Sequence, residues 1–250
     1  MARRALRDNV FESTISGPGH SRVNEVAMSV ENTTYSSRAQ TALATNSVLR
    51  NTYMLLSATL LFSATIAGIT AAMNLPYPGM IITLVGYFGL LFLTNATANS
   101  GWGIVSVFAL TGFMGYTLGP IINMYLTQFS NGAELVTMAM GGTGAIFVGM
   151  SAYALMSGKR FNQWAGMLMI GIVVAFVMSI IAVVFSIPAL SMAVSFMFVL
   201  LMSGLIVYQT GEIVHGGETN YILATVTLFV TIYNLFLSLL QLLGVFAGDE

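Results

Sequence analysis

The sequence predicts an all-α membrane protein: a seven-transmembrane-helix bundle that follows a disordered N-terminal tail. Three observations lead to this fold class. Hydrophobic residues make up 56% of the chain and charged residues 7%, whereas soluble domains usually carry about a quarter charged residues. Seven long apolar stretches follow one another from residue 53 onward. The first 50 positions hold ten of the seventeen charged residues, so the rest of the chain is almost uncharged.

Residues 1 to 50 form the predicted tail. They are rich in Ser, Thr, Asn and Arg and contain few large apolar side chains, so they bury too little surface to fold alone. No short apolar stretch follows the first positive charges, as a cleaved secretory signal would require. Six arginines against four acids are too sparse for the dense basic face that binds nucleic acid. We therefore expect two parts, a disordered cytoplasmic tail at 1–50 and a seven-helix membrane domain at 51–250.

The apolar stretches set the number and the approximate positions of the spans. A helix needs roughly 20 residues, at about 1.5 Å each, to cross a hydrocarbon core of about 30 Å. Pro76 and Pro78 end the first stretch, because proline lacks a backbone donor and disfavours helix before it. The second stretch is short. The predicted spans cover residues 53–73, 79–94, 102–124, 134–156, 162–185, 190–208 and 221–246.

The positions of lysine and arginine predict the orientation, since these residues are retained on the cytoplasmic side. The arginine-bearing tail places the N-terminus inside. Lys159 and Arg160 follow the fourth predicted span, which puts them on the same side. Because both signals agree, seven spans leave the C-terminus outside and the polar loop at 209–220 inside.

Small residues mark the expected helix contacts, because lipid tails are as apolar as leucine and helices in a membrane associate by close packing. Three glycines recur at spacings of three and four on one side of the third span, namely Gly112, Gly115 and Gly119. The motif GYTLGP, which contains a GxxxG match, ends at Pro120. We expect plain packing there. A second close approach is expected in the fourth span at Gly141, Gly142 and Gly144.

Asn234 is the most conspicuous amide within the predicted spans. An unpaired amide would be costly at membrane depth, because no water is present there to bond to it. We therefore expect its side chain to bond to a neighbouring helix.

The reactive groups that membrane enzymes require are missing from the sequence. Intramembrane aspartyl proteolysis needs two aspartates at membrane depth, whereas the chain's aspartates are Asp8 and Asp249. The metalloprotease motif HExxH and the serine motif GxSxG do not occur. The chain also holds no cysteine for a thiolate metal site. We predict no enzymatic activity, no cofactor and no metal.

The polar loop before the last span gathers three side chains of the kind that ligate metals. Glu212, His215 and Glu218 follow one another at spacings of three. Gly216 and Gly217 weaken any helix there, so a solvated, glycine-hinged loop is the favoured interpretation over a metal site. We expect this loop to offer a surface for a protein partner.

Ion pumps and proton-coupled transporters usually leave ionisable residues inside the membrane. No charged residue occurs between Arg50 and Glu134, and none occurs between residues 162 and 211. This pattern counts against a charge-relay transporter, although a pore lined by carbonyl groups or by apolar side chains would leave no such mark.

Three segments resemble the Bax inhibitor family: VLRNTY before the first span, LTGFMGYTLGPIIN in the third, and EIVHGGETNYILATVTLFVTIYNLF leading into the last. The match runs in order from Val48 to Gly244. The resemblance implies a seven-helix fold in a bacterial inner membrane, with a central last helix wrapped by the other six. The C-terminus, which the positions of lysine and arginine put outside, is then periplasmic. In the bacterial branch of the family the resemblance also implies a partner and inhibitor of the ATP-dependent membrane protease FtsH, beside the HflK and HflC proteins. The tail would then be a handle for the protease and the chain a candidate substrate.

The sequence departs from the calcium-leak members of the family at two positions. Those members carry a pair of aspartates, and the matching residues here are Gln209 and Thr231, which do not ionise near neutral pH. A pH-gated pair of acids is therefore not carried over. The resemblance implies a non-enzymatic modulator of FtsH, with a pH-insensitive calcium or cation leak as the alternative.

Overall fold

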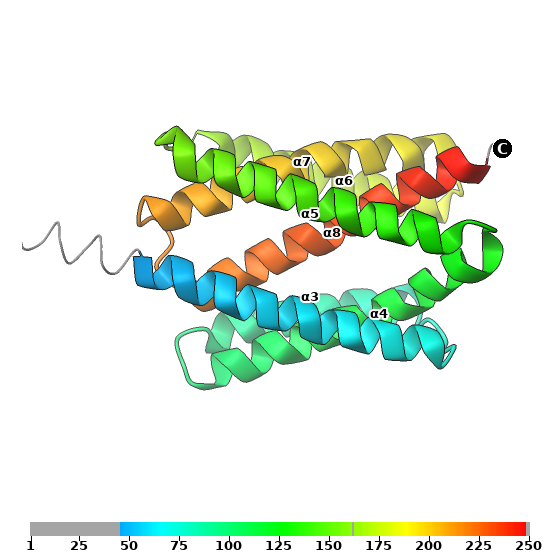
Figure 1. Ribbon diagram of the computed structural model, residues 1–250, viewed down its shortest axis with the longest axis horizontal. Coiled ribbons are helices and arrows are strands. Elements are labelled where there is room, and N and C mark those ends of the chain that lie inside the picture. The colour runs from blue at the N-terminus through cyan, green and yellow to red at the C-terminus, as the bar shows by residue number, and fades with distance from the viewer. Residues whose placement is uncertain (1–45, 162, 249–250) are drawn as a thin grey trace, which may run out of the picture. The chain divides into compact units, whose positions relative to one another are not determined.

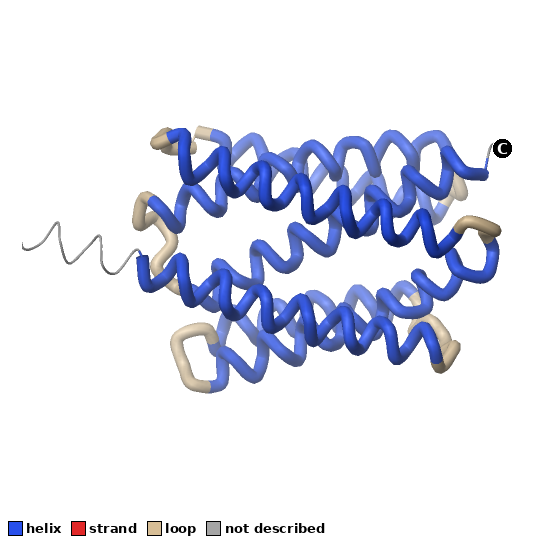
Figure 2. Tube along the Cα trace, viewed as in Figure 1, coloured by secondary structure: helices blue, strands red, loops and turns tan. Residues whose placement is uncertain are grey.

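The computed structural model describes residues 46–161 and 163–248. Within these residues, seven helices are long and apolar enough to cross a membrane, so the predicted fold class is confirmed. The first span is the helix Asn46–Ala72. The labelled helices are α3 (Met80–Thr97), α4 (Trp102–Gln128), α5 (Gly132–Ser157), α6 (Trp164–Val184), α7 (Pro188–Val214) and α8 (Tyr221–Gly248) (Figure 1). Short loops join the helices, as Figure 2 shows.

Two predicted boundaries differ from the structure. The first span begins at Asn46, so the end of the predicted tail lies inside this helix, whereas residues 1–45 of the tail lie outside the described residues. The prediction that Gln209 to Val214 belong to a polar loop was wrong, because α7 continues to Val214. Gln209, Thr210 and Ile213 are buried, and their packing against the bundle extends the helix through a polar stretch that the hydropathy pattern interprets as loop.

The helices end where the sequence offers turn-forming residues. Gly158 follows α5 with a φ of 60°, a left-handed conformation that glycine adopts without a steric penalty. Pro188 occupies the first turn of α7, where its missing N–H is not needed. The side-chain oxygen of Asn220 accepts the backbone N–H groups of Ile222 and Leu223 and so caps α8.

The last helix lies between two groups of three helices (Figure 1). One group contains the first span, α3 and α4, and the other contains α5, α6 and α7. Helix α8 contacts α4, α5 and α7, and 61% of its apolar stretch is buried, against 6% for α3. The expectation of a central last helix is therefore confirmed, and α3 is the least buried of the seven spans.

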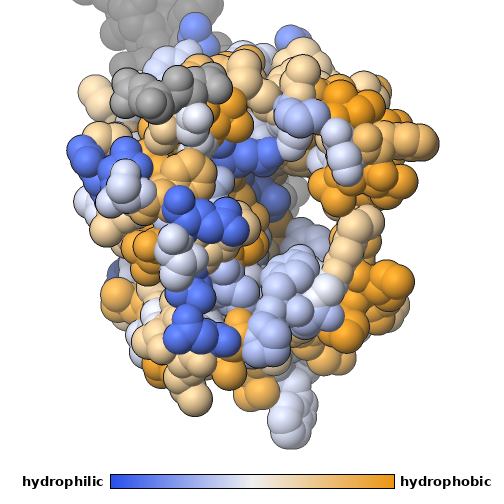
Figure 3. Space-filling model, turned by 90° about the vertical axis from the view of Figure 1, so that its right-hand side faces the viewer, coloured by the Kyte–Doolittle hydropathy of each residue, from blue (hydrophilic) through white to orange (hydrophobic). Residues whose placement is uncertain are grey.

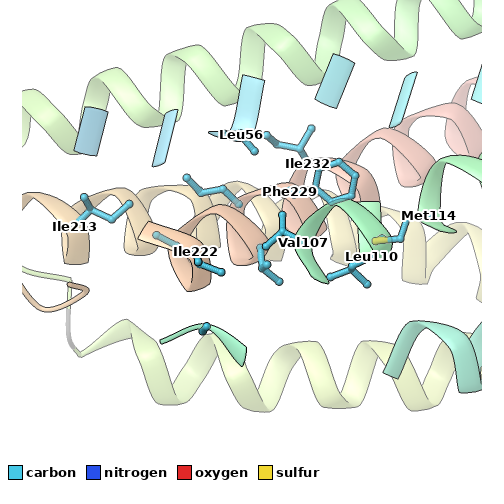
Figure 4. Close-up of a cluster of buried hydrophobic side chains, with 12 residues drawn as sticks. Leu56, Val107, Leu110, Met114, Ile213, Ile222, Phe229 and Ile232 are labelled. Carbon is cyan, nitrogen blue, oxygen red and sulfur yellow. The ribbon is translucent and has the colours of Figure 1, made fainter. Parts of the chain in front are cut away.

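The largest buried cluster joins the first span, α4 and α8. Leu56, Leu110 and Phe229 meet in this cluster (Figure 4). Buried threonines among the spans donate their hydroxyl groups to carbonyl oxygens of their own helices, as Thr59 does to Leu56 at 2.9 Å and Thr94 to Leu90 at 2.8 Å. These bonds satisfy polar groups that would otherwise be costly in a medium without water.

Polar and apolar side chains are separated on the surface. Large apolar side chains are exposed along the outer faces of the spans, including Ile81, Phe92 and Leu200. In Figure 3, which looks onto the end of the bundle where α8 ends, polar side chains gather toward the middle and apolar ones lie along much of the rim. This distribution suits a bundle whose sides face lipid and whose ends face water.

Candidate functional site

The three glycines of α4 pack directly against the first span. A side-chain carbon added at Gly115 would lie 2.9 Å from the hydroxyl oxygen of Ser63, and one added at Gly119 would lie 2.7 Å from the carbonyl oxygen of Ala67. One added at Gly112 would lie 2.9 Å from the ring of Phe62. The two helices therefore approach so closely along this line that no ligand could fit between them.

The expectation of a second close approach in α5 was wrong. A side-chain carbon at Gly141 or Gly144 would meet nothing within 4 Å, and one at Gly142 would reach only an ordinary contact with Leu239 at 3.5 Å. The reason is that Gly141 and Gly144 lie on the exposed face of α5, where no neighbouring backbone is present.

Pro120 lies inside α4, which continues on to Gln128. Proline has no N–H group, so the carbonyl oxygen of Tyr116 has no helical partner at this turn. The residue directly follows Gly119 and stands at the end of the glycine contact.

Gln209 of α7 and Thr231 of α8 are both buried. Ile206 and Leu235, each one turn away from these residues, belong to one buried cluster, so Gln209 and Thr231 lie at similar depths. The Thr231 hydroxyl donates to the carbonyl oxygen of Thr227 at 2.6 Å, whereas the Gln209 amide nitrogen has no partner. The pair therefore offers neutral hydrogen-bonding groups where an acidic pair would carry charge.

Polar contacts near Gln209 join the first span to α7 and α8. The hydroxyl oxygens of Tyr53 and Thr210 lie 3.4 Å apart. The Thr225 hydroxyl, which donates to the carbonyl oxygen of Tyr221 at 2.7 Å, lies 3.3 Å from the carbonyl oxygen of Thr52. The sequence holds no local signal for these contacts, because each residue pairs across more than 150 positions of the chain.

Glu212, His215 and Glu218 lie around the turn between α7 and α8, and their polar groups bond to the backbone there. His215 ends α7, and its Nδ1 lies 2.8 Å from the carbonyl oxygen of Gly211. A Glu218 carboxylate oxygen accepts the backbone N–H of Asn220 at 2.7 Å, and the carbonyl oxygen of Glu212 accepts the N–H of Gly217 at 2.8 Å. Within residues 46–161 and 163–248, no three acidic, histidine or cysteine side chains are arranged to hold a metal ion.

Asn220 joins the α7–α8 loop to the α3–α4 loop. Its amide nitrogen donates to the carbonyl oxygen of Ala98 at 3.1 Å and to the side-chain oxygen of Asn99 at 2.9 Å. The same residue caps α8, so one side chain positions both loops at this end of the bundle. An Asn directly before an apolar run was the sequence signal for the cap.

The described charged residues divide unevenly between the two ends of the bundle. Arg50, Lys159, Arg160, Glu212 and Glu218 lie toward the end where the first span begins and where α5 and α7 end. Glu134 lies at the opposite end, in the first turn of α5. We call the first of these the charged end; it includes the 215–220 loop.

The expectation for Asn234 was wrong, because its amide donates to the carbonyl oxygen of Val230 in its own helix at 2.8 Å. The side chain faces a cavity of about 670 Å³, and this space keeps neighbouring helices out of its reach. Thr231 and Tyr233 also line the cavity, as does Glu218.

The cavity lies where the two helix groups separate beside α8. Helix α3 packs on α4, and α6 packs on α7. Across the seam between α3 and α6, the rings of Phe88 and Phe176 meet edge to face with their centroids 5.8 Å apart. We call this line the α3–α6 seam.

Two polar contacts at membrane depth also escaped the sequence analysis. Tyr233 lies 3.0 Å from the hydroxyl of Thr117 and so links α8 to α4. The Gln241 side chain accepts from the hydroxyl of Ser195 at 2.8 Å and donates to that of Ser191, which links α8 to α7. Serine, threonine and tyrosine are common in membrane helices, so the sequence held no signal that singled out these pairs.

Comparison with known proteins gives a consistent family. A family model described as inhibitor of apoptosis-promoting Bax1 matches residues 45–248. The modulator of FtsH protease YccA of Escherichia coli K12 is 50% identical over 207 residues, which cover 83% of this chain and 94% of that protein. The inner membrane protein YccA of E. coli O6:H1 has the same identity and coverage. An uncharacterized protein of Pseudomonas aeruginosa is 50% identical over 203 residues, 81% of this chain and 91% of that protein.

Proposed function

Since the chain belongs to the Bax inhibitor family, we propose that it is a non-enzymatic, multi-pass inner-membrane modulator of an FtsH-type protease. The observation that carries this proposal is the 50% identity to the E. coli modulator over 94% of that protein's length. The identity extends through the membrane bundle, so the surface that meets a partner is expected to be shared. The sequence offers no catalytic set that would argue for an enzyme.

The charged end is the surface that we assign to the protease partner. An ATP-dependent protease works on the cytoplasmic side, where ATP is present, and the positive-inside rule puts Lys159 and Arg160 on that side. The N-terminus is then cytoplasmic and the C-terminus periplasmic. Asn220 joins the α7–α8 loop to the α3–α4 loop at this end, which favours a rigid surface over a flexible one.

A reconstitution measures the modulation. This chain and an FtsH-type protease are placed in the same vesicles, and the turnover of a membrane substrate is followed. Slower turnover in the presence of the chain is expected, and unchanged turnover at a molar excess would refute the proposal. A Lys159→Glu, Arg160→Glu double variant should weaken the effect, because it reverses the charge at the charged end.

Glu134→Lys is the matched control for that double variant. It also changes a charge near the end of a helix, because Glu134 lies in the first turn of α5, but this turn is at the opposite end of the bundle. Its effect on turnover should be small. Equal losses from both variants would show that the charged end has no special role. Co-purification with HflK and HflC tests whether those proteins share the complex.

The predicted tail, of which residues 1–45 lie outside the described residues, has a separate test. In the proposed scheme it is the handle by which the protease engages this chain as a substrate. A chain that lacks residues 1–40 should persist longer in the presence of the protease than the full chain. If both are degraded at the same rate, the handle is not in this segment, while the modulator proposal stands on the turnover measurement.

The cation leak is the alternative. It predicts calcium flux into dye-loaded vesicles above that of empty vesicles, without dependence on pH, because Gln209 and Thr231 do not ionise near neutral pH. Flux at that level, together with unchanged protease turnover, would favour the leak over the modulator.

A further inference from the structure

We infer that the cavity beside α8 binds one acyl chain of an ethanolamine phospholipid, which enters sideways through the α3–α6 seam with its ammonium group at Glu218. This site goes beyond the proposed function and does not depend on it. The inference rests on the wall of the cavity, its opening, its length and its charge.

The size and the lining of the cavity suit an apolar ligand. The cavity's volume of about 670 Å³ lies within the range of about 300–1,000 Å³ that is usual for ligand pockets. Most of the lining side chains are apolar, among them Leu91, Ile172, Phe198 and Met202. A chain of methylene groups would gain contacts along the apolar part of this wall.

The polar groups of the wall have much of their hydrogen bonding met within the protein. The Thr117 hydroxyl donates to the carbonyl oxygen of Met114 at 2.9 Å, so it is the acceptor for the hydroxyl of Tyr233. The Thr231 hydroxyl and one N–H of Asn234 donate to carbonyl oxygens of α8. These donors are already used, which lowers the cost of covering them with an apolar chain.

The opening faces lipid. The outer faces of α3 and α6 expose apolar side chains, including Val85 at 69% and Ile170 at 68%. Phe88 stands at the seam, is 48% exposed, and meets Phe176. A seam of this kind admits a lipid chain more readily than water, since lipid is the solvent on that side.

The length of the cavity fits one leaflet. Its α3 wall runs from Thr83 to Asn95, thirteen residues of helix or about 18 Å from the first to the last. Half of a hydrocarbon core of about 30 Å is about 15 Å. An acyl chain that follows the whole wall from the leaflet at the charged end would therefore extend slightly past mid-membrane.

The charge at one end selects the headgroup. Glu218 is the lining residue with a carboxylate, and one of its oxygens accepts from the backbone of Asn220. The second oxygen can accept from a ligand. A carboxylate at this position attracts the ammonium group of a phospholipid with an ethanolamine headgroup. It repels the net negative charge of a phospholipid with a glycerol headgroup.

Photo-crosslinking of the full chain tests the site. The chain is purified and placed in vesicles of ethanolamine and glycerol phospholipids, with a trace of ethanolamine lipid that carries a photoreactive group in its acyl chain. Labelling is mapped by mass spectrometry of the peptides. Labels on inward positions such as Ile172 and Met202 are expected, in addition to labels on outward positions. Labels confined to outward positions would mean surface lipid alone and would overturn the inference.

Ile172→Trp fills part of the cavity and should reduce labelling of the inward positions severalfold. Val174→Trp is its control, because Val174 lies on the same helix, is 48% exposed and does not line the cavity. Equal inward labelling in both variants would contradict a chain inside the cavity.

The headgroup preference gives a second measurement that needs no bulky substitution. Labelling by photoreactive lipids with ethanolamine and with glycerol headgroups is compared in the same vesicles. Glu218→Gln should reduce the preference for the ethanolamine lipid about threefold to fivefold. This is the size expected of a partly exposed ion pair. Glu212→Gln, a charge change at the same end but outside the cavity lining, should leave the preference unchanged. A preference that survives Glu218→Gln would remove the headgroup assignment. Because no protease is present, these outcomes are independent of the modulator proposal.

Discussion

Two contacts of the first helix group, one inside the group and one with the second group, differ in how closely their helices approach. Between α4 and the first span, three glycines bring the backbones together, and a single added carbon would collide at Gly119. At the α3–α6 seam, two aromatic rings meet edge to face and leave a cavity behind them. The comparison shows that small residues close a membrane interface, whereas large side chains that meet at their ends hold two helices apart and create space.

Gly119→Leu should have the largest effect on this contrast. The added side chain would collide with the carbonyl oxygen of Ala67, and relief of that collision requires the two helices to separate. We expect a loss of about 3 kcal/mol in the free energy of unfolding, measured by thermal unfolding in detergent. Gly141→Leu is the control, since nothing lies within 4 Å of the added carbon. Equal midpoints for the two variants would mean that the glycine contact does not stabilise the bundle.

Thr117→Val should have an intermediate effect. It removes the acceptor of the Tyr233 hydroxyl and leaves that buried group unpaired, which costs about 1–3 kcal/mol. Thr137→Val provides the comparison, because the Thr137 hydroxyl is exposed and bonds within its own helix. The same unfolding measurement applies. A loss no greater than that of Thr137→Val would show that the bond between α4 and α8 contributes little.

Phe88→Ala should have the smallest effect on stability and a clear effect on access. It removes an edge-to-face contact worth about 0.5–1.5 kcal/mol and opens the α3–α6 seam. The chain has no cysteine, so Ile172→Cys is a unique reporter of the cavity. Its reaction with a lipid-soluble thiol reagent should accelerate when Phe88 is replaced. Phe92→Ala, at a position that is 77% exposed on the same helix, should leave the rate unchanged.

Much of the fold could be predicted because hydropathy is a local property of the chain. Seven apolar stretches became seven helices, and the shortest of them is α3 with 18 residues. The end of α7 could not be predicted this way. Gln209 and Thr210 are polar by composition but buried by position, and burial depends on helices that are remote in the sequence.

The candidate site was predicted less completely. The motif around HGGETN located the loop at the charged end, but the capping role of Asn220 was not predicted. The cavity was not foreseen, because its wall is drawn from five helices and one loop. Asn234 was expected to bond to a neighbouring helix, but the cavity lies beside it and its amide bonds within α8.

The sequence by itself determined the number of spans, the family and the absence of charged residues from long stretches of the membrane domain. Only the tertiary structure decided which glycines bring helices together. Gly115 and Gly144 lie in similar small-residue patterns, yet one meets the backbone of the first span and the other meets nothing within 4 Å. The physical reason is that spacing along a helix sets the face on which a residue lies, whereas what packs against that face depends on the arrangement of the other six helices.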